Sequence, residues 1–334
     1  MQVAILGGGI NGFCCAVQIK EKWPESNVTI ISDLFTPSTT GDGSAGLWGP
    51  YLMCDTPAEK VNEWSMAMHN FLKQIWLSGD SGKAGVCLIP VIRLTANEKP
   101  MDDSWRDIVY GCKNLDKSEL EAYSRLHNKT FTSGLHFVTY TSEPVKLLPY
   151  LEKRFRSSGG NVITKKITDF DEFIRNSHYD VIVNCVGLGA LDLVNDKLVH
   201  SIRGQVSRVK ANWIYQVFLD ESDDGNYIIP NVDTVVLGGT HQENDYNLNI
   251  CPNDKTFIKN GCQNYFPGLK HAQHLTDWVG LRPGRKQVRL EMETTYNNKI
   301  LIHNYGHGGC GVTLSWGCAS EVVKLLQTTM KSKL

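Results

Sequence analysis

Apolar positions near the start of the chain follow the order that is typical of a βαβ unit. Val3 to Leu6 form a short apolar run, which predicts a buried strand. A mostly apolar helix is predicted from about Asn11 to Lys22, and it closes near Pro24. A second strand is predicted from Asn27 to Ser32. This end of the chain is therefore expected to form an α/β domain.

A glycine-rich turn joins the first predicted strand to the helix. Its residues are Gly7, Gly9, Ile10, Asn11 and Gly12, and they fit the G-x-G-x-x-G pattern. The first glycine permits a tight turn, the second lets the backbone approach a pyrophosphate, and the third lets helix and strand pack closely. The turn is therefore predicted to bind the diphosphate of a dinucleotide.

The surrounding context makes this prediction more specific than the glycines alone. Asp33 ends the second strand, roughly 20 residues after the third glycine, where an acid can accept hydrogen bonds from an adenosine ribose. Strand, turn, helix, strand and acid thus occur in order, which an incidental glycine turn would not produce. Further along, Val181 to Val186 reads as a buried parallel strand, whereas Gln205 to Val209 and Thr234 to Leu237 read as antiparallel strands.

Composition and charge exclude several classes of partner. The chain has 334 residues, 41% of them hydrophobic, and a formal net charge of -1. A chain this long can bury a full core, and its charge gives no field that attracts nucleic acid or an anionic membrane. No apolar run approaches the ~20 residues of a membrane span, and Met1 leads directly into the first strand, so no secretory signal is expected.

The cysteines and histidines indicate neither a disulfide framework nor a metal site. Ten cysteines are present without C-x-x-C pairs, so a reducing compartment is expected. Cys14 and Cys15 fall in the predicted apolar helix and are expected to be core thiols. No cluster of histidine, cysteine and carboxylate residues has the spacing of metal ligands, so no metal is predicted.

A loop rich in hydroxyls and glycines runs from Thr36 to Tyr51. Such a loop can wrap a phosphate, although a solvated connection has the same composition. Its residue order resembles the flavin loop of the D-amino-acid oxidase and D-aspartate oxidase family, and the resemblance covers nearly the whole chain. The other matching segments are Tyr179–Gly187, Arg203–Gln205, Tyr227–Pro230, Leu237–Thr240, Gly280–Pro283 and Ile302–Gly309.

The resemblance implies an α/β fold with two interleaved domains. One is an FAD-binding, Rossmann-like domain, and the other is an α+β substrate domain built on a mixed or antiparallel sheet. The FAD-binding domain would comprise residues 1–55, 145–195 and 280–334. The substrate domain would comprise residues 56–144 and 196–279.

The resemblance also implies an activity. An enzyme of this family would use FAD and oxygen to convert a D-amino acid into a 2-oxo acid, ammonia and hydrogen peroxide, by hydride transfer from Cα to flavin N5. Arg282 would anchor the substrate carboxylate, Tyr227 would add a phenolic hydrogen bond, and the Gly309 carbonyl would receive the amino group. Local sequence alone does not favour Arg282 over Arg285 or Arg289, which would equally suit surface ion pairs.

FAD contacts follow from the same resemblance. In addition to the glycine turn, they are Asp33, Thr39, Thr40, Ala45, Gly46, Leu47, Ile167, Gly308, Gly309, Gly311, Val312 and Thr313. His303 and His307, in the Ile302–Gly309 segment, are more typical of structural imidazoles than of ligands.

The substrate is expected to be acidic. The loop between Trp213 and Tyr227 is short and lacks the extra tyrosine of the longer lid in enzymes for neutral D-amino acids. His241 lies where vertebrate D-aspartate oxidases carry arginine, and it can donate to a side-chain carboxylate. A run of acids in the same loop is expected to face water. These acids are Asp220, Glu221, Asp223 and Asp224.

Three alternatives stay open, and one targeting signal is present. The chain could oxidise neutral or basic D-amino acids, it could be an NAD-dependent dehydrogenase, or it could be a non-catalytic flavin-binding protein. The last three residues, Ser332-Lys333-Leu334, match the tripeptide that a peroxisomal import receptor reads, so a location in the peroxisomal matrix is expected. The sequence does not indicate the oligomeric state.

Overall fold

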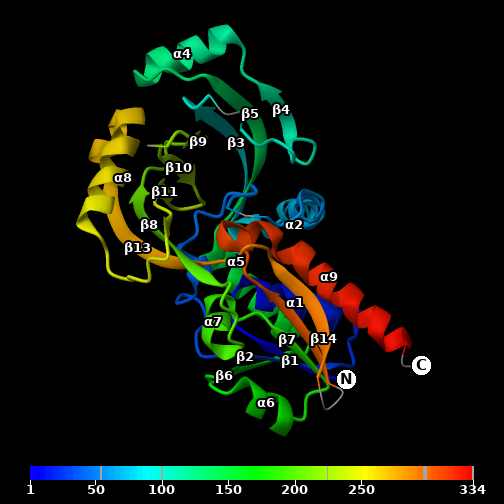
Figure 1. Cartoon of the computed structure of the whole chain (residues 1–334). Coiled ribbons are helices and arrows are strands. Elements are labelled where there is room, and N and C mark those ends of the chain that lie inside the picture. The colour runs from blue at the N-terminus through cyan, green and yellow to red at the C-terminus, as the bar shows by residue number, and fades with distance from the viewer. Residues whose placement is uncertain (53–54, 99–100, 224, 296–298, 333–334) are drawn as a thin grey trace.

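Two β-sheets organise the chain in the computed structural model, which describes residues 1–52, 55–98, 101–223, 225–295 and 299–332 (Figure 1). Sheet A consists, in spatial order, of β14 (Arg289–Thr294), β15 (Ile300–Tyr305), β7 (Val181–Asn184), β1 (Gln2–Leu6), β2 (Asn27–Ser32) and β6 (Asn161–Thr164). Sheet B consists of β12 (Gln242–Glu243), β8 (His200–Lys210), β11 (Val235–Gly238), β10 (Tyr227–Pro230), β9 (Val217–Asp220), β3 (Val86–Thr95), β5 (Ser133–Ser142) and β4 (Tyr110–Asn114), with β13 (Gln273–Gly284) paired to β8.

Helices cover these sheets. They are α1 (Ile10–Lys22), α2 (Ala58–Leu77), α3 (Ser81–Ala84), α4 (Lys117–His127), α5 (Pro144–Ser157), α6 (Phe170–Asn176), α7 (Ala190–Leu193), α8 (Pro252–Tyr265) and α9 (Gly311–Ser332). Short 3₁₀ turns are η1 (Thr40–Gly43), η2 (Gly187–Gly189), η3 (Pro267–His271) and η4 (Gly308–Cys310).

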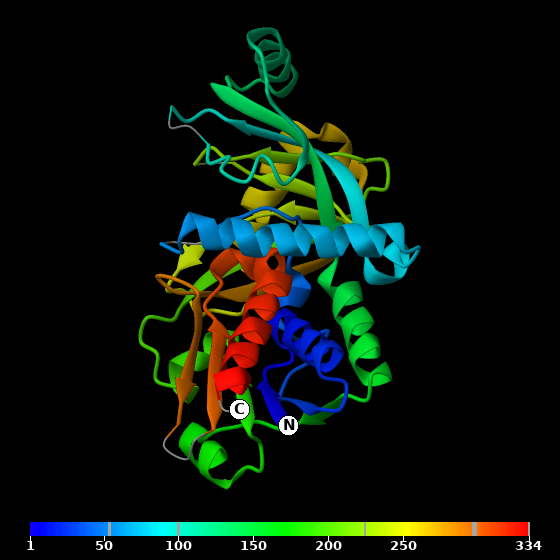
Figure 2. The same ribbon diagram turned by 90° about the vertical axis from the view of Figure 1, so that its right-hand side faces the viewer.

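Sheet A is mostly parallel and is covered on both faces. β1 lies at its centre, parallel to β2 and β7, and its side chains from Val3 to Leu6 are buried. Both faces of β1 are therefore apolar, as a central parallel strand requires. Helices α1, α5 and α9 contribute to the main core on one face, while α6 contributes Phe170 and Ile174 to a smaller core on the other. In Figure 2, α2 crosses the molecule between sheet B and the helices of sheet A, and it packs against α9, β3 and β5.

Sheet B is mostly antiparallel, and its outer face is covered by α4 and α8. The expected antiparallel pairing of the strands near residues 205–209 and 234–237 is confirmed, because β8 pairs with β11. The expected first strand, helix and second strand are also confirmed, each within one residue of β1, α1 and β2. Cys14 and Cys15 are buried free thiols, as predicted. The domain boundaries stay a prediction, and the one between residues 279 and 280 falls within β13.

The described residues contain neither a membrane-spanning helix nor a cluster of metal ligands. None of their helices combines the length and the apolarity that crossing a bilayer requires. Their histidine, cysteine and carboxylate side chains form no group of three or more that could hold a metal ion.

We expect the protein to lose stability in mild acid. His69, His303 and His307 are almost fully buried, and burial lowers the pKa of each to about 4. Unfolded histidine titrates near about 6.5, so the unfolded chain binds more protons between these values and the free energy of unfolding falls as the pH drops. Each histidine should lower the free energy of unfolding by roughly 2 kcal/mol at a pH of about 5.

Urea unfolding at pH values of about 7 and about 5 measures this loss. Carboxylates such as Asp196 and Asp220, whose pKa values lie below the usual range, titrate further into acid and leave this window undisturbed. Glu143 has a pKa raised by burial, so the folded chain binds this proton at a higher pH than the unfolded chain does, which offsets part of the loss as the pH drops. If the free energy of unfolding were the same at both pH values, the prediction that these histidines are buried in their neutral form would be wrong.

Candidate active site

The glycine turn between β1 and α1 is shaped for close approach by a ligand. Gly7 has a φ of 112°, and a methyl group added at Gly12 would come within 2.0 Å of the Gly7 carbonyl oxygen. A methyl group added at Gly9 would meet no protein atom within 4 Å. The start of α1 has no side-chain cap and no acidic residue in its first turn. Its free N–H groups and its dipole therefore favour an anion, and Gly9 leaves that space open.

The loop after β2 is shaped by a buried carboxylate. Asp42 accepts hydrogen bonds from the Thr39 N–H at 2.8 Å, the Thr39 hydroxyl at 2.7 Å and the Thr36 hydroxyl at 3.0 Å. Gly46 lies against β5, where a methyl group would come within 2.0 Å of the Ser142 carbonyl oxygen. The predicted FAD residue Thr39 thus uses its hydroxyl to build the loop, while Thr40 is exposed. Sequence reasoning missed the role of Asp42.

The next segment of that loop, Tyr51 and Leu52, packs against the C-terminal glycine cluster at Gly308 and Gly309. Methyl groups at Gly308 and Gly309 would come within 2.3 Å of the Leu52 carbonyl oxygen and within 2.7 Å of Tyr51 Cδ1. Cys310 Sγ lies 2.8 Å from the Tyr51 carbonyl oxygen and 2.6 Å from its amide nitrogen. Burial raises the pKa of Cys310 to about 12, so it remains a thiol that holds Tyr51 in place.

The structure brings the three glycine-rich segments together. The Asn11 side-chain amide lies 3.4 Å from His307 Nδ1, which links the first turn to the last cluster. The Thr313 hydroxyl donates to the Gly49 carbonyl at 3.2 Å, which links the same cluster to the loop after β2. Asn11 Oδ1 and His307 Nε2 are buried without a hydrogen-bond partner among the described residues. An uncapped helix start, an open glycine and two unsatisfied polar atoms fit a dinucleotide in this place.

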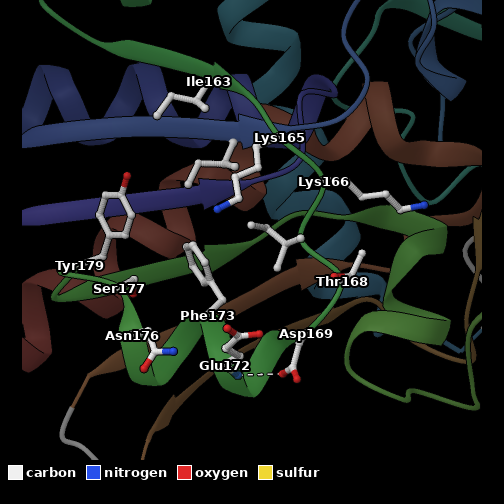
Figure 3. A pocket seen from close by; sticks show the side chains of 12 residues that line it. Ile163, Lys165, Lys166, Thr168, Asp169, Glu172, Phe173, Asn176, Ser177 and Tyr179 are labelled. Atoms are coloured by element: carbon white, nitrogen blue, oxygen red, sulfur yellow. Dashed lines mark hydrogen bonds between the residues drawn. The ribbon is translucent and has the colours of Figure 1, made fainter.

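Two predicted FAD residues lie apart from this junction. Asp33 is exposed directly after β2. Ile167 lines a cavity of about 360 Å³ between β6 and α6, which Figure 3 shows with Phe173 and Tyr179 in its wall. The lining of that cavity includes none of the glycine-turn residues, so its position gives no support to a flavin role for Ile167.

Arg282 and Tyr227 meet on the face of sheet B that carries the candidate site. Arg282 lies opposite Ile202 in the β13–β8 pair, and Tyr227 lies opposite Gly238 in the β10–β11 pair. The Arg282 charge acts on the Tyr227 phenol, and Arg282 Nη1 donates to the Thr240 carbonyl at 3.1 Å. Burial raises the pKa of Tyr227, although the Arg282 charge opposes the shift. The phenol is therefore protonated at neutral pH and available as a donor.

Tyr51 belongs to the same neighbourhood, and sequence reasoning missed it. Desolvation raises the pKa of Tyr51 to about 12, while the Arg282 charge opposes the rise and Tyr227 and Glu221 add to it. Its ring packs on Gly309, which the resemblance assigns to the substrate amino group. The signal in the sequence was its position at the end of the hydroxyl-rich loop, but only the tertiary contact reveals it.

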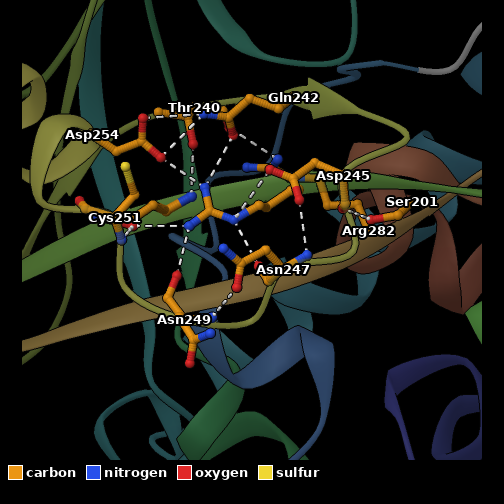
Figure 4. Close-up of polar contacts among 11 residues, drawn as sticks. Ser201, Thr240, Gln242, Asp245, Asn247, Asn249, Cys251, Asp254 and Arg282 are labelled. Atoms are coloured by element: carbon orange, nitrogen blue, oxygen red, sulfur yellow. Dashed lines mark hydrogen bonds and ion pairs between the residues drawn. The ribbon is translucent and has the colours of Figure 1, made fainter.

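A buried arginine supports this part of the site from the opposite face of β8. Arg203 donates to Asp254 at 2.7 Å, to Gln205 at 3.1 Å and to the carbonyls of Asn247 and Asn249 (Figure 4). The neighbouring Gln205 N–H donates to the Thr240 hydroxyl at 2.9 Å. Thr240 is thereby fixed, and it in turn holds Arg282. The next residue, His241, is exposed.

The expectation that the acidic run faces water is wrong for Asp220. This carboxylate is buried and accepts from Lys129 at 2.7 Å, from Ser222 at 2.6 Å and from the Tyr265 hydroxyl. Burial would raise its pKa, but these hydrogen bonds hold the pKa below its usual value. Glu221 pairs with Arg93 at 2.6 Å, and Asp224 lies outside the described residues. The run looked solvated because its partners come from distant parts of the chain.

Comparison with known proteins identifies the family. The model of the family described as FAD dependent oxidoreductase matches residues 2–325. The chain belongs to this family. It is 39% identical to a D-amino acid oxidase of Dugesia ryukyuensis, with all of both chains covered. It is 35% identical to a D-aspartate oxidase of Homo sapiens, over 97% of this chain and 94% of that one.

A solved structure shows the same fold. Glycine oxidase from Geobacillus kaustophilus superposes with a TM-score of 0.80 at 19% identity, over 98% of this chain and 94% of the other. The expected α/β flavoprotein fold and the expected family are thus confirmed. The cofactor of this oxidoreductase is FAD, which leaves the nicotinamide-dependent alternative without support.

Proposed function

We propose that this protein is an oxidase of D-amino acids that prefers acidic substrates such as D-aspartate and D-glutamate. Oxygen is the acceptor, and the products are a 2-oxo acid, ammonia and hydrogen peroxide. The observation that carries the proposal is the position of Arg282 and Tyr227 on one face of sheet B, against Gly204 and Gly238, where the Arg282 charge acts on a protonated Tyr227 phenol. The curated relatives, a D-amino acid oxidase and a D-aspartate oxidase, support the substrate class.

In this proposal the side chains bind and orient the substrate. FAD, when bound, supplies the acceptor for the hydride that leaves Cα. Arg282 holds both carboxylate oxygens with its planar fork, and Tyr227 donates to one of them. The Gly309 carbonyl accepts from the amino group. These three contacts fix the direction of the Cα–H bond, and the chemistry then needs no side-chain base.

Two observations bear on the substrate side chain, and they point in opposite directions. His241 follows Thr240, the residue that holds Arg282, and its imidazole can donate to a side-chain carboxylate. The Glu221 charge acts on Tyr51 and would repel such a carboxylate, although its ion pair with Arg93 weakens the effect. Neutral or basic D-amino acids are therefore the second candidate substrates.

Peroxide release from the FAD-loaded protein tests the proposal. The substrates to compare are D-aspartate, L-aspartate, D-glutamate, D-alanine and D-lysine. We expect release with D-aspartate and D-glutamate and none with L-aspartate. Faster oxidation of D-alanine or D-lysine would favour the second candidate, and no release with any D-amino acid would refute the oxidase.

His241→Phe should weaken binding of acidic substrates selectively. A hydrogen bond to a charged group contributes roughly 1.5–3 kcal/mol, so KM for D-aspartate should rise about 10- to 100-fold. KM for D-alanine should change less than about threefold, because this substrate has no second carboxylate. Steady-state kinetics with both substrates measures the difference, and His271→Phe on η3 is the surface control. Equal effects on both substrates would show that His241 does not determine the preference for acidic substrates.

Import into peroxisomes completes the proposal. It would use Ser332-Lys333-Leu334, of which Lys333 and Leu334 lie outside the described residues. A fluorescent fusion with this tripeptide at its free end should enter peroxisomes, and one without it should not. Equal distribution of the two fusions would refute this location.

A further inference from the structure

Both side chains of the proposed carboxylate anchor lie flat on glycine backbone. A methyl group added at Gly204 would come within 2.3 Å of both Arg282 Nη atoms and within 2.4 Å of Cζ. A methyl group added at Gly238 would come within 2.1 Å of Tyr227 Cζ and within 2.4 Å of its hydroxyl oxygen. The guanidinium and the phenol therefore occupy the space that side chains at these two positions would fill.

The register of sheet B explains why these contacts exist. Gly204 lies opposite Gly280 in the β8–β13 pair, two residues along β13 from Arg282. Residues two apart on a strand share a face, so the Arg282 side chain can lean over Gly204. Gly238 pairs directly with Tyr227. At Gly204 and at Gly238, the sheet therefore has no side chain on the face where Arg282 and Tyr227 lie.

The backbone of Gly204 does not itself need glycine. It lies within β8, and its φ is outside the left-handed region, so alanine would fit the strand without strain. The overlap would fall on the far end of a flexible side chain. To reach an ordinary separation of about 3.5 Å, the guanidinium would have to move by about 1 Å.

We propose that Gly204 is a positioning residue that sets the plane in which Arg282 presents its guanidinium to the substrate carboxylate. The guanidinium lies against Gly204, and its Nη1 donates to the Thr240 carbonyl at 3.1 Å. Gly238 gives Tyr227 the same kind of support. The proposal rests on the function proposed above, because it assigns the guanidinium to a carboxylate.

The test is Gly204→Ala, with carboxylate binding read from the flavin absorption of the FAD-loaded protein. Succinate and propionate are the probes, because they are D-aspartate and D-alanine without the amino group and are not turned over. Displacement of a positioned group by about 1 Å costs on the order of 100-fold. We therefore expect a rise of about 100-fold in the Kd of the better-bound probe, with FAD affinity and Tm unchanged.

Two controls separate this role from a general effect of alanine. Gly82→Ala on α3, where a methyl group meets nothing within 4 Å, should leave probe binding unchanged. In an Arg282→Lys background, Gly204→Ala should cost less than about threefold, because lysine has no planar fork to displace. A Gly204→Ala protein that binds the probe like the wild type would overturn the proposal, as would an equal loss in the lysine background.

A failure of the Gly204 proposal can be distinguished from a failure of the proposed oxidase function. A wild-type protein that binds succinate or propionate but releases no peroxide with any D-amino acid would refute the oxidase. The effect of Gly204→Ala on binding would still decide the role of Gly204. A wild-type protein that binds neither probe would overturn the carboxylate anchor and this proposal with it.

Discussion

Arg282→Lys is expected to lower kcat/KM for the best D-amino acid by about a thousandfold, or about 4 kcal/mol of transition-state stabilisation. Lysine keeps the charge but loses the planar fork that binds both carboxylate oxygens. It also loses the donor to the Thr240 carbonyl that orients the group. Without this anchor the Cα–H bond is no longer held in one direction, so kcat should fall as well as affinity. Steady-state kinetics of the purified FAD-loaded variant measures both quantities.

The matched control is Arg285→Lys, three residues further along the chain. Arg285 donates to Asp196 at 3.0 Å and to the Gln287 carbonyl, and neither contact involves Tyr227. This variant should keep kcat/KM within about threefold of the wild type. If Arg285→Lys lost as much activity as Arg282→Lys, the assignment of the anchor to Arg282 would be wrong.

Gly9→Ala is expected to weaken FAD binding by at least about 100-fold while leaving the protein folded. Gly9 has φ -87° and ψ -174°, an extended conformation that alanine adopts freely, and the added methyl group meets no protein atom within 4 Å. The methyl group therefore projects into space that the fold leaves open at the start of α1. If the FAD diphosphate uses that space, only the ligand meets the methyl group.

Titration of the apoprotein with FAD measures this affinity, and thermal unfolding of the apoprotein measures the fold. Gly12→Ala is the contrasting variant, because its methyl group would come within 2.0 Å of the Gly7 carbonyl oxygen and should lower both FAD affinity and Tm. A Gly9→Ala protein with wild-type FAD affinity would show that the diphosphate does not lie against this turn.

The sequence was sufficient for elements whose signal is local. The βαβ unit was predicted within a residue at each end, because apolar runs, a glycine turn and a closing Pro24 all act within about 30 residues. β8 and β11 were recognised for the same reason, although β8 extends beyond the predicted run. The order of residues in the glycine-rich segments was also sufficient to predict the family and FAD as the cofactor.

Contacts between distant segments could not be predicted in this way. The proposal of Arg282 as the anchor depends on such contacts: Asp196 and Tyr305 engage Arg285 and Arg289, whereas the Arg282 charge acts on Tyr227. Tyr51 meets Gly309 across more than 250 positions of sequence. The burial of Asp220 depends on Lys129 and Tyr265, and no periodicity in its own loop reveals them.

The role of Gly204 also lies beyond local pattern. In sequence it is one glycine of an Arg-Gly-Gln segment, directly before the strand predicted from Gln205 to Val209. Its meaning appears only when the register of β8 and β13 brings Arg282 over it. The same holds for Gly238 and Tyr227, whose pairing across β10 and β11 no single segment contains.

The most direct test of the anchor is a crystal structure of the FAD-loaded protein with bound succinate. We expect one carboxylate of succinate to lie within about 3 Å of two Arg282 nitrogens and of the Tyr227 hydroxyl, on the side of the guanidinium away from Gly204. A carboxylate held by another residue, with Arg282 still bonded only to protein groups such as the Thr240 carbonyl, would contradict the account.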